Sequence, residues 1–346
     1  MLERSEQNAE QPWSDQSLIV VGGRQRAGAI DLDEWHAYEA ALIVIVDPNS
    51  NRTEVAVEYG SPAEVCAADQ PSIVFKAGER RGDRLLVCTQ TETMEFDCRT
   101  WQRTRYLTHP WFNDVHHVCY GDDNSWMVAD TGLDLVLKID QEGQVLDSWN
   151  VGRTATWDRF DPNVDFRRVH TTKPHEAHHN KLFKLGGVWW AVRYHYQDAV
   201  QLDDLTKTMS ISAGHPHNGL IVDDTDVMFT TTNGCVVRMD SSSRQQVACF
   251  NLSKDSHPDS RLGWCRGICL AEPNLVWVGF SRLRPAWIRK YLSWIKQGFQ
   301  HKGTYGTQTT RIALYDLSGP KLVREINLES IGMNAVFGIY PLKDSH

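Results

Sequence analysis

The chain has 346 residues, of which 41% are apolar and 23% charged, and its formal charge is −8. This composition excludes a collagen, a disordered chain and a coiled coil, and the acidity argues against nucleic acid as a partner. No apolar run approaches the roughly 20 residues of a membrane span. Residues 1–16 are polar and unlike a signal peptide. We therefore expect a polar tail over 1–16 and a single domain over 17–346.

The eight cysteines are too few for a disulfide scaffold in a chain of this length. Cys265 and Cys269 have no second cysteine pair nearby to complete a structural zinc site. Several others lie in apolar, strand-like runs, where a free cysteine behaves as a small buried apolar residue. Reduced thiols and no export signal predict a cytoplasmic protein.

The first half of the domain consists of strand-length apolar runs separated by turn residues. Residues 17–60 supply three runs, and residues 72–108 supply four, beginning at Pro71 and Ser72 with no chemically active group. Residues 114–150 form the clearest unit, with the runs DVHHVCYG, SWMVADTG, LVLKIDQEG and QVLDSWN. Their boundaries carry Gly, Asp or Asn, as hairpins require. Four antiparallel strands in about 40 residues is the period of a propeller blade.

The second half repeats this unit over 179–212, 217–252 and 265–327, and ends with the single run NAVFGIYPL. The three runs at the start and the one run at the end together complete a blade, which closes the ring and removes exposed sheet edges. The sequence thus predicts an all-β, six-bladed propeller with a helical insertion over 282–303 in its last blade. Two packed β-sandwiches are the alternative, but no linker-like segment separates two halves.

Residues 128–132 (VADTG), 136–140 (VLKID) and Gly143 resemble an NHL repeat, and residues 264–268 (WCRGI) are similar to the start of one. The chain therefore resembles the six-bladed NHL-type propeller superfamily. That superfamily includes lactonases, strictosidine-synthase-like enzymes, an amidating lyase and non-catalytic binding proteins. The resemblance implies the fold and leaves the choice among these functions open.

Histidines gather where the inner strands of the propeller are expected to begin, beside the central channel. Three adjacent units each place one at the matched position, and these are the predicted metal ligands: His116, His179 and His217. Four more lie beside them: His117, His175, His178 and His215. Neutral imidazoles from separate strands suit a divalent metal, with Zn favoured and Fe, Cu, Mn or Ca as alternatives. The competing interpretation is that these histidines only bind water and backbone in a polar channel.

Other residues near these positions complete the predicted site. Asp114 and Glu176 precede two of the histidines and are expected to orient ligands. Arg266 begins the inner strand of the next unit, where a cation could bind an anionic substrate or stabilise negative charge; packing between blades is its alternative role. We predict catalytic roles for Arg266, His117 and His178, and substrate contacts for Arg266, Asn334 and Tyr196.

The amidating lyase of the superfamily is similar in placing three axial histidines on zinc, with an Arg and a Tyr near the substrate. This resemblance carries over to His116, His179 and His217, and to Arg266. Its tyrosine has no clear match here, so Tyr194 and Tyr196 are candidates. The calcium pattern of the lactonases needs Glu, Asn and Asp at such positions, which the three histidines do not fit.

Residues 273–315 contain seven basic and no acidic side chains. Within them, apolar residues at helical spacing predict a basic amphipathic helix over 285–299 that carries Trp287 and Trp294. This helix could form a lid over the channel, dock on the propeller or a second subunit, or bind a membrane surface. The long loop over 153–175 is expected to form another wall of the site.

The sequence therefore favours a metal-dependent lyase or hydrolase that acts on a small, anionic molecule in the channel. Two other functions remain open. One is a non-catalytic scaffold that binds a protein or a membrane surface, and the other is an oxidase or oxygenase with histidine-bound iron or copper.

Overall fold

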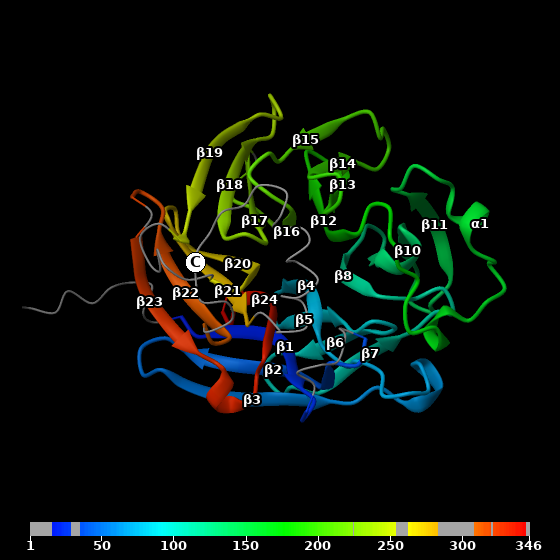
Figure 1. Ribbon diagram of the computed structural model, residues 1–346, viewed down its shortest axis with the longest axis horizontal. Helices are drawn as coiled ribbons and strands as arrows, with labels where there is room; N and C mark the ends of the chain where they lie inside the picture. The colour runs from blue at the N-terminus through cyan, green and yellow to red at the C-terminus, as the bar shows by residue number, and fades with distance from the viewer. Residues whose placement is uncertain are drawn as a thin grey trace, which may run out of the picture.

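The sheets stand around a common centre in the computed structural model, with their inner strands at the centre and their outer strands at the rim (Figure 1). The structure describes residues 16–28, 35–223, 225–253, 262–282, 308–319 and 321–343. The predicted tail, apart from Gln16, and the predicted helical insertion, apart from Arg282, lie outside the described residues.

The two ends of the described chain meet in one four-stranded sheet with the order β24-β1-β2-β3. Strands β1 and β24 pair antiparallel, from Leu18 opposite Pro341 to Gly23 opposite Ala335, so the last strand closes the ring against the first. The strands of this sheet are β1 (Leu18–Gln25), β2 (Tyr38–Asp47), β3 (Arg52–Tyr59) and β24 (Ala335–Pro341).

An eight-stranded sheet follows along the chain, in the order β11-β10-β9-β8-β4-β5-β6-β7. Its two four-stranded halves are joined by one parallel pairing of β4 with β8, at Ala77 and His117. Its strands are β4 (Lys76–Arg81), β5 (Arg84–Cys88), β6 (Thr93–Asp97), β7 (Arg103–Leu107), β8 (Val115–Tyr120), β9 (Trp126–Asp130), β10 (Leu135–Ile139) and β11 (Val145–Asn150).

Three further sheets each take four consecutive strands of the described chain. The first holds β12 (His179–Leu185), β13 (Val188–Arg193), β14 (Asp198–Gln201) and β15 (Thr208–Ser210). The second holds β16 (Pro216–Ile221), β17 (Asp226–Thr231), β18 (Cys235–Asp240) and β19 (Gln246–Asn251). The third holds β20 (Trp264–Glu272), β21 (Leu275–Ser281), β22 (Arg311–Asp316) and β23 (Lys321–Asn327).

Helical turns are few and short in the described part of the chain. The only α-helical turn there is α1 (Thr156–Arg159), and the 3₁₀ turns are η3 (Ala63–Val65), η4 (Thr131–Leu133), η5 (Phe166–Arg168) and η6 (Glu329–Ile331). None of the helices among these residues is both long and apolar enough to cross a membrane.

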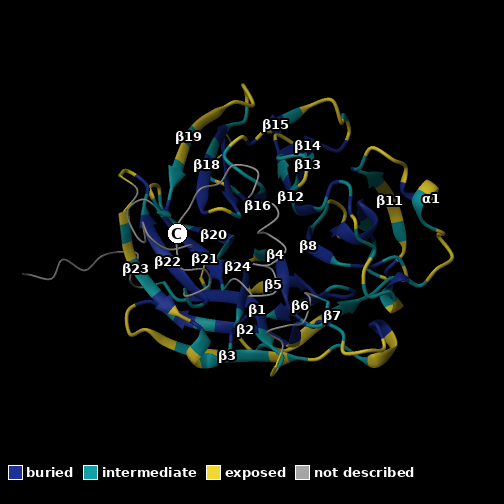
Figure 2. Cartoon of the chain, viewed as in Figure 1, coloured by how far each residue is buried: buried dark blue, intermediate teal, exposed yellow. Residues whose placement is uncertain are grey.

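The core lies between neighbouring sheets, because the middle strands are apolar on both faces. Strand β9, with the sequence WMVAD, is buried at every residue, whereas the rim strand β11, VLDSWN, is buried at none. Figure 2 shows the same gradient from a buried interior to exposed rim strands and loops. The inner strands contact one another in the closed order β4, β8, β12, β16, β20, β24 and back to β4. The chain is thus an all-β propeller. All eight cysteines are free, as predicted.

Candidate functional site

Irregular pairing within the inner strands turns particular side chains toward the ring axis. In five of these strands at least one residue is left without a partner in the neighbouring strand, which is a β-bulge that re-aims the side chain it carries. The unpaired residues are His116 in β8, Asn180 in β12, His217 in β16, Gly267 and Ala271 in β20, and Phe337 in β24.

The bulges place the three predicted metal ligands differently. His116 and His217 are both bulged and buried, with 6.2 Å between their ring centroids. His179 instead pairs regularly with Arg193, and its Nε2 lies 2.9 Å from the carbonyl oxygen of Leu135. Asn180 therefore stands at the position that the sequence pattern assigned to His179.

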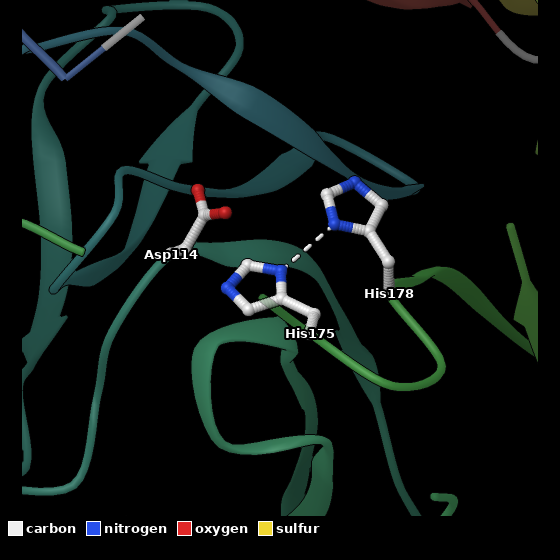
Figure 3. A group of neighbouring side chains, drawn as sticks. All are labelled: Asp114, His175 and His178. Atoms are coloured by element: carbon white, nitrogen blue, oxygen red, sulfur yellow. Dashed lines mark hydrogen bonds between the residues drawn. The ribbon is translucent and has the colours of Figure 1, made fainter. Parts of the chain in front are cut away.

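His178, and not His179, lies beside His116, and their ring centroids are 4.9 Å apart. His178 also belongs to the cluster in Figure 3, where the ligand atoms of Asp114, His175 and His178 all lie within 4.8 Å of one another. Nδ1 of His175 lies 2.9 Å from Nδ1 of His178. In the described part of the chain, this is the group of His, Cys, Asp and Glu that could hold a metal.

The backbone holds two of these three residues in an uncommon conformation. Asp114 and His178 directly precede β8 and β12, and both have positive φ, at 52° and 50°. A non-glycine residue in this region costs of order 1–3 kcal/mol, and such residues concentrate at functional sites. The chain bends at the head of two adjacent inner strands, and this bend brings the two side chains together.

Asp134 anchors the loop that carries both histidines of the cluster. Its carboxylate accepts hydrogen bonds from the backbone N–H groups of Glu176, Ala177 and His178, at 2.8, 3.0 and 3.1 Å. Arg159 donates to the same carboxylate at 2.8 Å. Asp134 directly follows η4 within the NHL-like segment. Through these hydrogen bonds, that segment positions the loop that leads into β12.

Burial keeps the imidazoles of the cluster neutral. It lowers the pKa of His175 to about 4 and that of His116 to about 3, and the Lys76 ammonium adds to the effect at His116. Burial and the neighbouring His116 lower the pKa of His178 well below its usual range. Burial alone would raise the pKa of Asp114, but Lys76 and the nearby imidazoles bring it to about 2.

Lys76 is a site residue that the sequence did not reveal. It begins β4, is buried, and donates a hydrogen bond to the Asp114 carboxylate, while its Nζ lies 3.3 Å from Nδ1 of His116. The sequence predicted no chemically active group in the second unit, because its inner strand was expected to begin at Pro71 and Ser72. The structure corrects this prediction.

His217 has an open acceptor nitrogen near the axis. Its Nδ1 lies 2.7 Å from Oδ1 of Asn218, and the Asn218 amide nitrogen donates to the Phe337 carbonyl oxygen at 3.3 Å. Nδ1 of His217 therefore carries the proton, and its buried Nε2 has no hydrogen-bond partner among the described residues. Burial and then the Arg266 charge lower its pKa well below the usual range.

The other predicted site residues differ in what they contact. The Arg266 guanidinium stacks on Phe337, 4.4 Å from the ring centroid, and its charge acts on both His116 and His217. Asn334 accepts from the backbone N–H of Gln25 at 2.8 Å, at the junction of the chain ends. The Arg193 guanidinium lies over the Tyr196 ring, 4.4 Å from the ring centroid. The ring of Tyr194 instead lies beside that of His178, with 5.3 Å between the centroids.

The side chains of His117 and Glu176 make hydrogen bonds and contacts within the fold. His117 is fully buried, with its nitrogens against Gly78, Lys181 and Leu182. Glu176 accepts from the backbone of Arg153 and Thr154, at 2.8 and 2.9 Å, so it fixes the long loop and does not touch the cluster.

The long loop over 153–175 reaches the site, as expected for a wall. Asn113 donates to the carbonyl oxygens of Phe166 and Val169, at 2.9 and 2.7 Å, which fixes the loop beside Asp114. A cavity of about 50 Å³ lies here, lined by Asp114 and by loop residues that include Arg167 and His170.

The cluster presents its side chains in the forms that bind metals, namely an ionised carboxylate and two neutral imidazoles. Two ligand nitrogens on tetrahedral Zn²⁺ lie about 3.3 Å apart, given Zn–N distances of about 2.0–2.1 Å. In the structure the two Nδ1 atoms lie 2.9 Å apart and share a hydrogen bond, so one of them would give up its proton before both could bind a metal (Figure 3). Three protein ligands leave at least one position open for water or substrate.

No protein-family model matches the sequence, and no curated protein matches it. Solved structures do match the fold. A protein of unknown function from Bacteroides caccae aligns with a TM-score of 0.60 and 13% identity, covering 95% of this chain and 100% of that chain. The nidogen/laminin complex contains a chain that aligns with a TM-score of 0.55 and 7% identity, covering 94% and 98%. At these identities the likeness concerns the propeller fold alone.

Proposed function

We propose that this propeller is a metal-dependent enzyme that acts on a small anionic molecule near the ring axis, where the inner strands β8 and β12 begin. Asp114, His175 and His178 hold the metal in this proposal. The observation that carries it is the approach of their ligand atoms to within 4.8 Å of one another, from two neighbouring sheets. Lys76 and Arg266 supply positive charge beside them, which suits an anionic substrate.

The proposal also includes a six-bladed ring of NHL type. The eight-stranded sheet then counts as two blades, because only the pairing of Ala77 with His117 joins its halves. The NHL-like segment supports this by supplying Asp134, which fixes the loop of the histidines. Eight free cysteines favour a reducing compartment such as the cytoplasm.

Lyase or hydrolase chemistry is the favoured reaction class, since a bound Zn²⁺ would polarise a substrate oxygen or activate water in its open position. In that reaction Asp134 keeps the two imidazoles aligned, and Arg266 binds the negative charge of the substrate. Two histidines and one carboxylate are also the ligand set of non-haem iron oxygenases, which supports an oxygenase as the second candidate.

Metal content and metal affinity test the proposal. The purified protein is expected to carry about one equivalent of metal by elemental analysis, with affinity measured by titration of Zn²⁺ or Fe²⁺ into the stripped protein. The variants Asp114→Asn, His175→Gln and His178→Gln are each expected to lose more than about 100-fold in affinity, since changes behind the ligands already cost about 10–100-fold.

Two matched controls make the result specific. His179→Gln changes the histidine next to His178, which lies against the Leu135 carbonyl oxygen, and Glu176→Gln changes the residue directly after His175. Both are expected to retain metal affinity within about threefold, which is below the effect of a ligand loss. The enzyme proposal would be overturned if the folded wild-type protein bound no stoichiometric metal, or if the three ligand variants bound metal as tightly as the wild-type protein. A non-catalytic scaffold would then be the remaining function.

A further inference from the structure

A second cavity lies farther along the inner strands than the metal cluster. Its volume is about 190 Å³, and residues of β4, β12, β16, β20 and β24 line it. In β4 the strand passes from Lys76 at the cluster to Glu79 and Arg80 at the cavity, which is about 10 Å at 3.3 Å per residue. One liquid water takes about 30 Å³, so this cavity has room for a molecule of several non-hydrogen atoms.

The amine of Lys181 lines this cavity and touches a histidine whose protonation is fixed. The backbone N–H of Leu182 donates to Nδ1 of His117 at 3.3 Å, so Nδ1 carries no proton and the neutral ring carries its proton on Nε2. That Nε2 lies 3.0 Å from the Gly78 carbonyl oxygen and 2.7 Å from Nζ of Lys181.

This arrangement fits a neutral lysine. An ammonium has three donors and no acceptor, and the N–H of His117 has no lone pair to receive them. A neutral amine can accept that N–H instead, and all three contacts of the His117 ring are then compatible. The surroundings of Lys181 also favour its neutral form, because burial lowers its pKa, although the charges of Cys119 and Glu79 act in the opposite direction. The other charged groups that line the cavity are Arg80 and Glu79, and the Glu79 carboxylate accepts hydrogen bonds from Arg81 and from the backbone N–H of Tyr120.

We propose that Lys181 is a nucleophilic amine that forms an imine with a small carbonyl compound bearing a carboxylate, such as a 2-oxo acid. The hydrogen bond from His117 opens, and the nitrogen lone pair attacks the carbonyl carbon to form the C–N bond, while the carbonyl π electrons move to oxygen. One N–H proton passes to that oxygen and gives a hydroxyl. The hydroxyl leaves as water with a proton taken from solvent, the C=N bond forms, and the nitrogen returns its second proton to solvent. Arg80 supplies the positive charge for the carboxylate, and His117 is a positioning residue. This site is separate from the metal cluster.

Reductive trapping of the imine tests the proposal on the unmodified protein. Glyoxylate and cyanoborohydride at pH 7 would convert an imine into a stable secondary amine, which peptide mass mapping locates and times. Lys184 is an internal control on the same strand, since its ammonium binds Asp122 at 2.7 Å. We expect labelling of Lys181 to be at least about tenfold faster than that of Lys184, because each unit of lowered pKa raises the neutral fraction tenfold.

Variants and a second probe separate the parts of the proposal. The ratio of labelling rates, Lys181 over Lys184, is expected to be larger for glyoxylate than for acetaldehyde, which lacks the carboxylate. His117→Gln should slow labelling of Lys181 at pH 7 and restore it at higher pH, with Lys184 unchanged. Labelling of Lys184 as fast as Lys181 in the wild-type protein would overturn the proposal. Because stripped and metal-loaded protein should label alike, the result is independent of the metal cluster.

Discussion

At the scale of single residues, the imidazoles at the head of the axis are neutral because burial penalises their charged forms. The folded-state pKa values of His175 and His116, about 4 and about 3, lie below the value of about 6.5 of an unfolded chain. Between these values the unfolded chain binds more protons than the folded one, so the free energy of unfolding rises with pH.

We therefore expect the urea midpoint to increase from pH 4.5 to pH 7 and to level off above that. Each such histidine adds up to about 1.4 kcal/mol per pH unit within its window. His175→Gln removes one titrating group, so its midpoint should depend less on pH than that of the wild-type protein. Denaturation monitored by tryptophan fluorescence at several pH values measures both. Equal midpoints at pH 4.5 and pH 7 would contradict the expectation.

The sequence predicts that histidines gather where the inner strands begin, but it does not show which residue of each strand takes the bulged position. The pattern His-Asn-x-Leu occurs at both His179 and His217, which made the two histidines look equivalent. The extra residue of the bulge falls on the Asn in β12 and on the His in β16. A bulge leaves no signature in apolar periodicity, so the sequence does not show that Asn180, and not His179, is the bulged residue of β12. Lys76 was hidden because it begins its strand amid apolar neighbours.

At the scale of elements, the repeat predicts the strands well because each blade has an apolar middle and polar turns. What it does not show is how closely inner strands approach. A Cβ on Gly22 of β1 would lie 1.8 Å from the carbonyl oxygen of Ala335 in β24. Only glycine permits this pairing of the two chain ends, since backbone atoms cannot give way as a flexible side chain can.

Gly22→Ala is accordingly expected to lower the free energy of unfolding by about 1–3 kcal/mol, the range for overpacking. Gly60→Ala is the matched control, because a Cβ there would meet no atom within 4 Å. Urea denaturation of both variants beside the wild-type protein gives the comparison. Similar midpoints for the two variants would show that β1 and β24 can separate without cost.

At the scale of the whole molecule, stability depends on the closing strand. Val336 of β24 donates its N–H to Ser281 Oγ at 3.0 Å, so the last strand joins β21 of one sheet to β1 of another. A chain that ends at Gly332 would leave the inner edge of β1 unpaired, and such edges promote association.

We expect that truncated chain to elute as oligomers or aggregates in size-exclusion chromatography and to lose its near-ultraviolet circular dichroism. A chain that ends at Lys343 keeps β24 and should behave as the full-length protein. Monomeric, folded protein from the shorter chain would mean that the ring does not need its last strand.

Closure by the last strand also has a consequence for synthesis on the ribosome. Strand β1 is translated about 300 residues before its partner β24. At about 5–20 residues per second, the nascent chain carries the open edge of β1 for roughly 15–60 s. The segment from Asp114 to His178 emerges well before that time. The proposed metal ligands are therefore all present on the nascent chain while the ring is still open.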